Sequence, residues 1–495
     1  MTKHTISRRR MLQLSALGAA AASVNPYLPR SLAQNTDMQQ VDPKDRKLLF
    51  VLCGFGGASI IDSFLPIAQS EVGDDELAAK LNVFPDAMIE QVSGSNLRHV
   101  GLLDNYSYYV KPKNMGEFVR KHGQDLAVIA HDVSSVNHAV GQQRSLSGAG
   151  LDRGRTIMES MALRYGGGLS LPSCNMASGG YIEHGSDLSV SGRARHELIT
   201  SPVLFAMGTH GYRGQAGLPP GAAIARARKV REQLDRESVF ARTFAQSPRL
   251  QNYLRQREAA QSDFETQDMI DKLLLLEPGS LDPKLGLKGS ELTSVLRGKL
   301  PLLEQDDLQA QVGLGFLLAY HGMSTSVALG YRDDATIVDA GVISTPIGFD
   351  FSHTNHRMTQ SIMWCRTAGL LDTLISLLKE YDYMGDPSLG KMWNRSLIYI
   401  ATEFGRSKAR PMDSNSWGTA HDLNNGSVII SPLIKGNRVY GGVDPKTART
   451  YGFDPKTGEP NKDKTLFEGD VYSLIAHAMG IEFPGRVDFP SVVRG

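Results

Sequence analysis

The sequence predicts an α/β protein in which helices flank a mainly parallel β-sheet. Continuous apolar runs, too short for helices, end in glycine or polar residues. Such runs are typical of strands that are buried on both faces of a parallel sheet. Apolar residues at helical spacing fill several of the segments between these runs. Strands that alternate with helices along a chain favour a parallel sheet over an antiparallel one.

Five segments have the composition of buried strands. The first run, Leu48 to Cys53, lies in KLLFVLCGFGG and ends in glycines. The second run, Leu126 to Ala130, leads into a polar turn. The other three lie in MSTSVALGYRD, in RSLIYIATEFG (Ser396 to Thr402) and in GSVIIS. We expect these five segments to form the centre of the sheet.

Three segments are predicted as helices that cover the sheet: LQAQVGLGFLLAYHG, residues 356–383 and DVYSLIAHAMGIE. The region from about 220 to 310 differs, because it is rich in charge, favours helix and contains no strand-like run. We expect it to form a helical insertion on the sheet. Its charged residues are predicted to form a solvated helix face, with partner binding as the alternative.

Residues 1–33 read as an export signal. They have a basic start, a short Ala-rich apolar segment and the small-x-small sequence Ser31-Leu32-Ala33. SRRRMLQ, from Ser7 to Gln13, fits the twin-arginine pattern. This predicts a bacterial protein that the twin-arginine translocase exports, already folded, to the periplasm or the medium. A basic N-terminal helix is the alternative. Residues 34–46 then form a polar linker to one α/β domain, residues 47–495.

The charge balance of the mature chain limits its partners. The signal holds five basic residues and no acidic one, and the whole chain has net charge +1, so the remainder is near −4. It has no basic run, which argues against nucleic acid and against an anionic membrane. No later stretch reaches the roughly 18 to 20 apolar residues that span a bilayer. We therefore expect no transmembrane segment in the mature chain.

The three cysteines lack the spacing of a metal site. Cys53 reads as a small buried apolar residue. An odd count leaves at least one thiol unpaired. The sequence does not decide whether Cys174 and Cys365 form a disulfide after export.

Polar residues gather after the predicted strands, where α/β folds place their chemistry. They include Ser59, Asp62, His131, Asp132, Ser134, Ser135, Asn137, His138, Asp350, His353, His356, Glu403, Arg406, His421 and Asp422. Oxygen ligands alone suit Mg²⁺, Ca²⁺ or Mn²⁺, and added imidazole shifts the preference toward Zn²⁺, Mn²⁺ or Fe²⁺. A metal held here would activate water and neutralise a phosphoryl or sulfuryl oxygen. The Asp-x-x-His spacing alone is also explained by a plain loop hydrogen bond.

Several of these segments, in their order along the chain, resemble one exported protein family. They are KLLFVLCGFGGASIIDSFLP, LAVIAHDVSSVNHAVGQQRSLSG, PIGFDFSHTNH, ATEFGRS and GTAHDLNNGSVIIS. The family is domain of unknown function 1501, placed in the alkaline-phosphatase and sulfatase superfamily, and the resemblance covers most of residues 47–445. It implies a sulfatase-like α/β fold. It also implies a divalent ion (Zn²⁺, Mn²⁺ or Ca²⁺) held at Asp350, His353, Glu403 and His421.

The chain departs from the family pattern at carboxylate positions. Ser59, Val140 and Ala420 stand where the family has Asp, so the implied metal site is partly degenerate. No Cys or Ser lies in the sulfatase motif Cys/Ser-x-Pro-x-Arg, and no formylglycine is expected. Ser135, or its neighbour Ser134, is the best available alcohol nucleophile. The alternative is that these serines cap the next helix.

Two functions follow from the resemblance. The preferred one is an exported hydrolase of small phosphate or sulfate esters, in which Arg406 grips the oxyanion and His138 assists proton transfer. The other is a non-catalytic exported protein on the same fold that binds a cell-envelope ligand or another exported protein. The missing carboxylates keep this second function open.

Overall fold

The computed structural model describes residues 38–494, except 101–113, 177–180, 210–220, most of 248–289, 332–335, 340–341, 347, 412–413 and 415. The predicted signal, residues 1–33, lies outside the described residues. The predicted linker is described from residue 38, and this part packs on the domain. The Gln39 N–H donates to the Leu163 carbonyl at 2.8 Å, and the buried Arg46 donates to the Tyr165 carbonyl at 3.1 Å. Its polar groups thus find partners on the domain.

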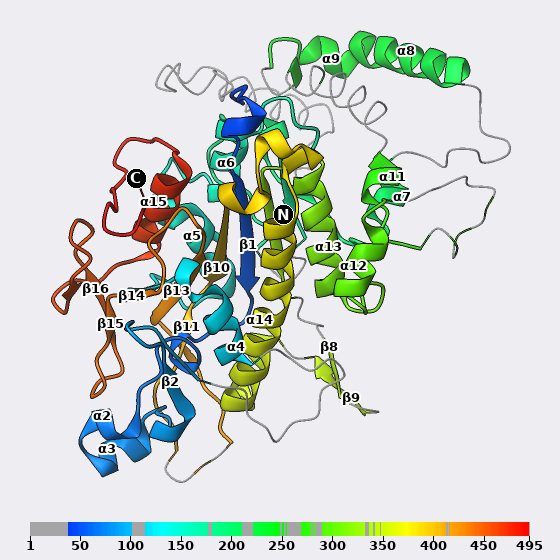
Figure 1. Cartoon of the computed structure of the whole chain (residues 1–495). Coiled ribbons are helices and arrows are strands. Elements are labelled where there is room, and N and C mark those ends of the chain that lie inside the picture. Colours follow the sequence, from blue (N-terminus) through cyan, green and yellow to red (C-terminus); the bar gives the residue numbers. More distant parts are fainter. Residues whose placement is uncertain are drawn as a thin grey trace, which may run out of the picture.

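The centre of the molecule is an eight-stranded sheet of order β14-β4-β13-β10-β1-β7-β5-β6 (Figure 1). Seven strands are parallel to one another, and β13 is antiparallel to both neighbours. This confirms the predicted α/β class and mainly parallel sheet. All five predicted segments are strands. The strands are β1 (Leu48–Gly54), β4 (Leu126–Asp132), β5 (Ser173–Asn175), β6 (Glu197–Leu198), β7 (Ser326–Gly330), β10 (Ser396–Thr402), β13 (Asn424–Ile430) and β14 (Arg438–Tyr440).

The direction of β13 decides which loops meet. Its first residue, Asn424, pairs with Asp132, the last residue of β4. Because β13 runs antiparallel, the loop before it, rather than the loop after it, lies at the carboxyl edge of the parallel strands. The loop that carries His421 therefore meets the loops that follow β4 and β10.

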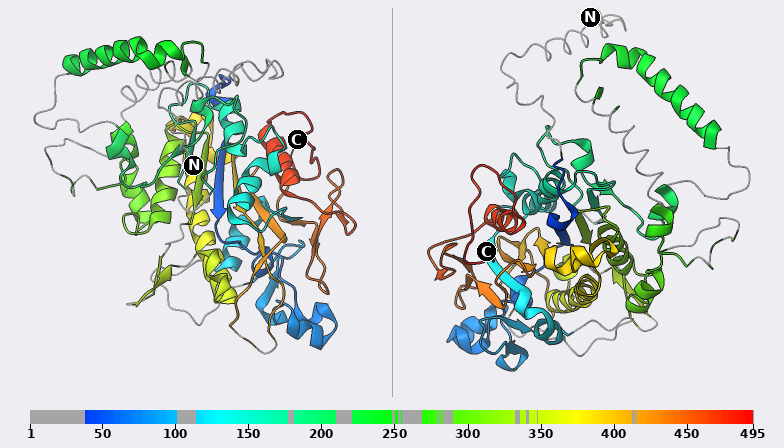
Figure 2. Two further views of the ribbon diagram at one scale, coloured as in Figure 1. Left: turned by 180° about the vertical axis from the view of Figure 1, so that it is seen from behind. Right: turned by 45° about the horizontal axis from the view of Figure 1, so that its top comes forward.

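Helices cover both faces of the sheet (Figure 2). Alternate residues of β1 belong to two separate core clusters: Phe50 packs with α4, α13 and α14, and Val51 packs with α5, α6 and α15. Burial on both faces explains the continuous apolar run in this strand. The helices are α4 (Met115–His122), α5 (His138–Ser147), α6 (Ile157–Tyr165), α13 (Asp307–Tyr320), α14 (His356–Glu380) and α15 (Glu468–Met479).

The cysteines are buried and free. Cys53 lies in the core, as predicted, and Cys174 and Cys365 form no disulfide with each other.

Within the described residues, one helix, α14, has the length and hydropathy to cross a membrane. About two thirds (67%) of its most apolar window is buried inside the protein. Leu371, Leu374 and Leu378 of this helix belong to the main core cluster. Its apolar character is thus accounted for by packing against the sheet.

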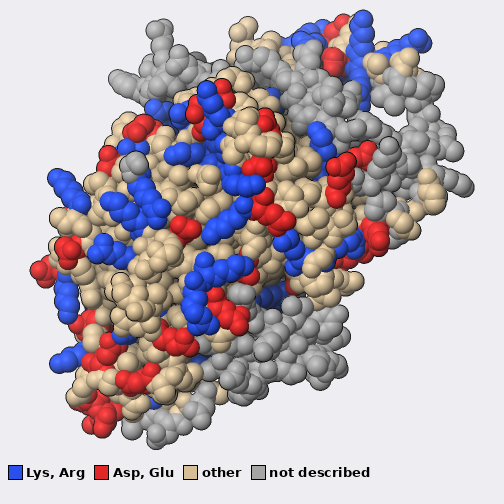
Figure 3. Space-filling model, viewed as in Figure 1, with Lys and Arg blue, Asp and Glu red and all other residues tan. Residues whose placement is uncertain are grey.

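The described part of residues 220–310 contains helices and no strand: α8 (Gly221–Glu237), α9 (Val239–Thr243), α11 (Met269–Leu273) and α12 (Thr293–Lys299). Helix α11 packs into the main core, whereas α8 lies apart from the sheet (Figure 1). On the face in Figure 3, acidic and basic side chains are interspersed.

The remaining α-helices and strands of the described residues are short: α2 (Gln69–Val72), α3 (Asp75–Lys80), α7 (Phe205–Thr209), β2 (Ile89–Gln91), β3 (Arg98–Val100), β8 (Thr336–Asp339), β9 (Val342–Pro346), β11 (Gly405–Arg406), β12 (His421–Asp422), β15 (Gly442–Val443), β16 (Thr450–Phe453) and β17 (Pro460–Asn461).

Candidate metal centre

Three imidazoles converge on one carboxylate oxygen at the carboxyl edge of the sheet. The Nε2 atoms of His353, His138 and His421 lie 3.4, 3.8 and 3.9 Å from Asp350 Oδ1. His353 Nε2 and His421 Nε2 are 2.9 Å apart. The side chains are 45%, 36% and 19% exposed for the three histidines and 38% exposed for Asp350. The group is therefore accessible from solvent.

Local structure delivers each of these side chains. Asp350 and His353 are three residues apart in the 3₁₀ helix η10 (Phe349–His353), which places them on one face because that helix has three residues per turn. His138 is the first residue of α5, whose N-cap Asn137 accepts a hydrogen bond from the Val140 N–H at 3.2 Å. His421 lies on β12, opposite Arg406 of β11.

A glycine lets the loop after β1 approach η10. Gly56 has φ of +86°, a conformation that other residues rarely adopt, and a Cβ there would stand 2.0 Å from the Asp350 nitrogen. Gly56 in the glycine run after the first strand is thus required by the close contact with Asp350.

Nδ1 of His138 and Nδ1 of His421 also have partners. His138 Nδ1 lies 3.1 Å from Glu403 Oε1, and His421 Nδ1 lies 2.8 Å from the Val136 carbonyl. His353 has a backbone hydrogen bond with Thr419. A carboxylate and a carbonyl only accept, so Nδ1 of His138 and of His421 is the protonated nitrogen. In metal sites such contacts fix the tautomer and the orientation of ligating imidazoles. The donor set therefore fits a divalent ion.

Electrostatics favours neutral rings at two of the three histidines. Burial and the nearby Arg406 guanidinium hold the pKa of His353 and of His421 below the ordinary histidine value. A neutral imidazole offers the lone pair of its unprotonated nitrogen to a metal. At His421 that nitrogen is Nε2, whereas His353 Nε2 donates to it at 2.9 Å and would have to lose this proton to bind an ion. The hydrogen bond to Glu403 raises the pKa of His138 instead. An ion at this site would compete with a proton mainly at His138.

Glu403 lies behind His138. Its side chain is fully buried, and its carboxylate accepts hydrogen bonds from the Gly56 N–H, from His138 and, at 2.7 Å, from Gln142 Nε2. The sequence predicted Glu403 as a metal ligand and His138 as a proton carrier. The structure instead groups His138 with Asp350 and His421 as residues that could hold an ion, and directs Glu403 to the far side of the His138 ring.

Arg406 is directed inward. Its side chain is fully buried, and it donates to the carbonyls of Gly56 (Nε, 3.0 Å) and Thr419 (Nη1, 3.4 Å) and to Asp350 Oδ1 (Nη2, 2.8 Å). These contacts hold Asp350 in place. The predicted grip on a substrate oxyanion would require the guanidinium to leave these acceptors.

The two candidate serines belong to the turn before α5. Ser135 Oγ accepts the Asn137 N–H at 3.1 Å, and Ser134 Oγ donates to Glu468 Oε1 at 2.8 Å. The helix N-cap itself is Asn137. The predicted capping role thus falls to Asn137, two residues after Ser135 and three after Ser134. Nothing in the described contacts joins the Ser135 hydroxyl to the imidazole group.

Two contacts that orient the rings could not be predicted from the sequence. Val136 and Thr419 act through backbone groups, which their side-chain types do not indicate. Ser59, which the resemblance aligns with an Asp, is buried, and no hydrogen bond of its hydroxyl is found among the described residues.

No protein-family model and no curated protein matches this chain. Among solved structures it is similar to BT1596, a 2-O GAG sulfatase, with 7% identity, 89% of this chain and 72% of that chain covered, and a TM-score of 0.30. A second is Ps i-CgsB, with 8% identity, coverage of 88% and 73%, and a TM-score of 0.29. Likenesses this weak carry no argument about the reaction. Membership of the domain of unknown function 1501 family stays a prediction.

Proposed function

We propose that this protein is a metal-dependent hydrolase of small phosphate or sulfate esters, with its ion at Asp350, His138, His353 and His421. The supporting observation is that three Nε2 atoms face one carboxylate oxygen while Nδ1 of His138 and Nδ1 of His421 are hydrogen-bonded. A donor set rich in imidazole favours Zn²⁺ or Mn²⁺ over Ca²⁺, which prefers oxygen ligands.

The ion and the residues around it would have different roles in hydrolysis. When bound, the ion would lower the pKa of a water molecule and neutralise an ester oxygen. Glu403 keeps the His138 proton on Nδ1 and directs Nε2 to the site. Arg406 keeps Asp350 Oδ1 in place. The solvent-exposed edges of the rings leave room for a small ester to approach.

A second candidate is a non-catalytic protein that binds an ion or a cell-envelope ligand at the same place. Two observations favour it. Arg406 already compensates the charge of Asp350, and the Ser135 hydroxyl accepts a hydrogen bond within its own turn. Neither a free oxyanion-binding cation nor an alcohol nucleophile is built into this arrangement of the described residues.

Metal analysis with ester assays separates the two candidates. The mature protein, purified without a histidine tag, is analysed for bound metals and then titrated with Zn²⁺, Mn²⁺ and Ca²⁺ alone. Aryl phosphate and aryl sulfate turnover is measured with each ion. We expect one ion per chain and turnover, both lost in His421→Ala. His184→Ala is the matched control, because the His184 ring contacts the ring of His196 instead.

The outcomes are distinct. One bound ion without turnover of any ester supports the non-catalytic candidate. No bound ion under any of these conditions contradicts both the metal centre and the hydrolase.

Export is also part of the proposal and rests on the sequence of residues 1–33. We expect the protein in the periplasm or medium of its host. Replacing both Arg8 and Arg9 by Lys should retain it in the cytoplasm, as shown by cell fractionation. Unchanged export of this variant would contradict the twin-arginine route.

A further inference from the structure

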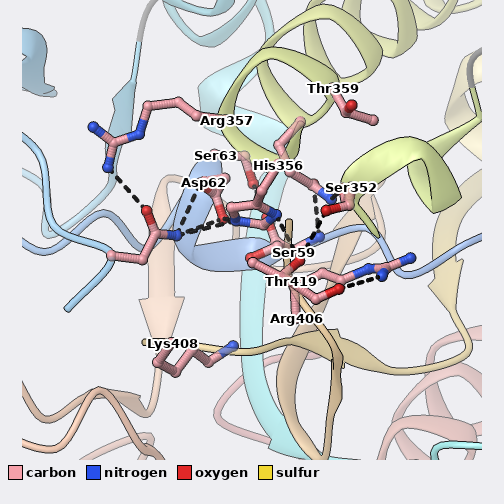
Figure 4. Close-up of polar contacts among 12 residues, drawn as sticks. Ser59, Asp62, Ser63, Ser352, His356, Arg357, Thr359, Arg406, Lys408 and Thr419 are labelled. Atoms are coloured by element: carbon pink, nitrogen blue, oxygen red, sulfur yellow. Dashed lines mark hydrogen bonds and ion pairs between the residues drawn. The ribbon is translucent and has the colours of Figure 1, made fainter. Parts of the chain in front are cut away.

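A second histidine–carboxylate pair lies in the interior, between the loop after β1 and the start of α14. His356 Nε2 is 2.9 Å from Asp62 Oδ2, and the two side chains are 0% and 1% exposed (Figure 4). Asn82 Nδ2 lies 3.0 Å from both Asp62 oxygens. Burial opposes ionisation of Asp62, but His356 and these hydrogen bonds hold its pKa well below the ordinary value. Asp62 is therefore an ionised, buried partner of His356.

The other nitrogen of His356 reaches Thr419. His356 Nδ1 and Thr419 Oγ1 are 3.2 Å apart (Figure 4). The backbone N–H of His356 donates to the Trp417 carbonyl at 2.8 Å. The Thr419 N–H donates to the Ser352 carbonyl at 2.9 Å. The Thr419 carbonyl accepts from Arg406. Segment 417–421 is thus attached to segment 352–356 by contacts at Thr419.

These two segments carry different members of the candidate metal centre. Asp350 and His353 belong to η10, and His421 belongs to β12. In the described sheets β12 pairs with β11, not with the η10 segment. The close approach at Gly418, where a Cβ would stand 2.0 Å from the His353 carbonyl oxygen, shows how tightly the segments pack. Their relative position depends on such loop contacts.

We propose that Asp62, His356 and Thr419 form a brace that sets the spacing between His353 and His421. Asp62 fixes the His356 ring, the ring fixes the Thr419 hydroxyl, and Thr419 holds its segment two residues before His421. This role presupposes the proposed ion site and makes the three residues positioning residues for it. A purely structural brace would change stability without changing ion affinity.

Thr419→Val tests the brace, because valine keeps the shape of threonine and removes the hydroxyl. We expect the affinity for Zn²⁺ or Mn²⁺, measured by calorimetry on the metal-stripped full-length mature protein, to fall about 10- to 100-fold. Thr419→Ser, which restores the hydroxyl, should bind like the wild type. Thr367→Val is the control: it removes another buried hydroxyl, bonded to Tyr331, and should lower stability without lowering ion affinity.

A second measurement needs no ion. Ring ¹⁵N shifts of His353 and His421 in the metal-free protein should change in Thr419→Val, while those of His131, which bonds Ser427, stay constant. If the wild type binds no ion, the proposed function fails and these shifts still decide the brace. If Thr419→Val leaves both the shifts and any ion affinity unchanged, the brace is overturned. Changed shifts with unchanged affinity would overturn its role in ion binding.

Discussion

Two carboxylate–imidazole assemblies in this protein use the same residue types in opposite surroundings. Asp350 faces three imidazoles at a solvent-exposed edge, with contacts of 3.4 to 3.9 Å to their Nε2 atoms. Asp62 faces one imidazole at 2.9 Å in the interior and is saturated by Asn82. The first leaves the Nε2 lone pair of His138 available to a ligand, and the second leaves no free nitrogen on His356. Access and unfilled coordination, rather than residue type, distinguish a candidate binding site from a structural pair.

The difference also has an energetic side. An exposed ion pair contributes about 0 to 1 kcal/mol to stability, because water solvates and screens both charges. Removal of one partner from a buried pair leaves an uncompensated charge and costs about 3 to 5 kcal/mol. Substitutions in the buried assembly should therefore lower stability, whereas substitutions in the exposed assembly can change binding at little cost in stability.

The largest expected effect is on stability. Asp62→Ala should lower the free energy of unfolding by about 3 to 5 kcal/mol, since it strands the buried His356. His353→Ala, at the exposed assembly, should change it by less than about 0.5 kcal/mol. Urea unfolding followed by circular dichroism measures both. Equal losses would remove the distinction between the two assemblies.

The next largest effect is on ion affinity and tests the exposed assembly. Glu403→Gln keeps the shape of the side chain but removes the charge behind His138, so ion affinity should fall about 10- to 100-fold. Calorimetric titration with Zn²⁺ or Mn²⁺ gives the value. Glu159→Gln is the matched control, because Glu159 is equally buried but pairs with Arg195. Undiminished affinity in Glu403→Gln would mean that His138 does not hold the ion.

Acid should act on the buried assembly. The pKa of Asp62 in the folded protein lies below its ordinary value of 3.8, so its ionised form is stabilised by folding. This contribution is fully present above that ordinary value and is lost as the pH falls below it. Asp62→Asn should therefore show a flatter decline of unfolding free energy than the wild type between about pH 5 and pH 2. Parallel pH curves for the two proteins would contradict the assignment.

The smallest effect concerns the predicted nucleophile. Ser135→Ala removes the acceptor of the Asn137 N–H and should cost less than about 1 kcal/mol, with unchanged ion affinity. Thermal unfolding and metal titration check this. Loss of all ester turnover with stability and affinity intact would instead identify Ser135 as the nucleophile.

The sequence predicted the sheet well where burial dictates composition. β1, β4, β7, β10 and β13 are apolar runs because both faces are covered. β5, β6 and β14 have only two or three residues, too few to form a pattern. The antiparallel direction of β13 is a matter of chain connection, which composition does not encode.

The sequence predicted where the residues of the candidate site lie, at the ends of strands, but not the role of each residue. Polar residues after strands include Glu403 and His138, but loop conformation decides that Glu403 is buried behind the ring. Asp62 and His356 were both named as strand-exit residues, yet 294 positions separate them and no spacing links them. Thr419 orients its neighbours partly through backbone groups, which are the same for every residue type.

Arg406 and His138 balance the negative charges of the site in the protein without a bound ion. Its guanidinium faces Asp350, and His138, with its raised pKa, faces Glu403, so each carboxylate already has a cationic or proton-donating neighbour. A cluster of bare carboxylates would repel itself once its ion was removed. Here the two negative groups are compensated from within the chain. We therefore expect that removal of the proposed ion leaves the protein folded.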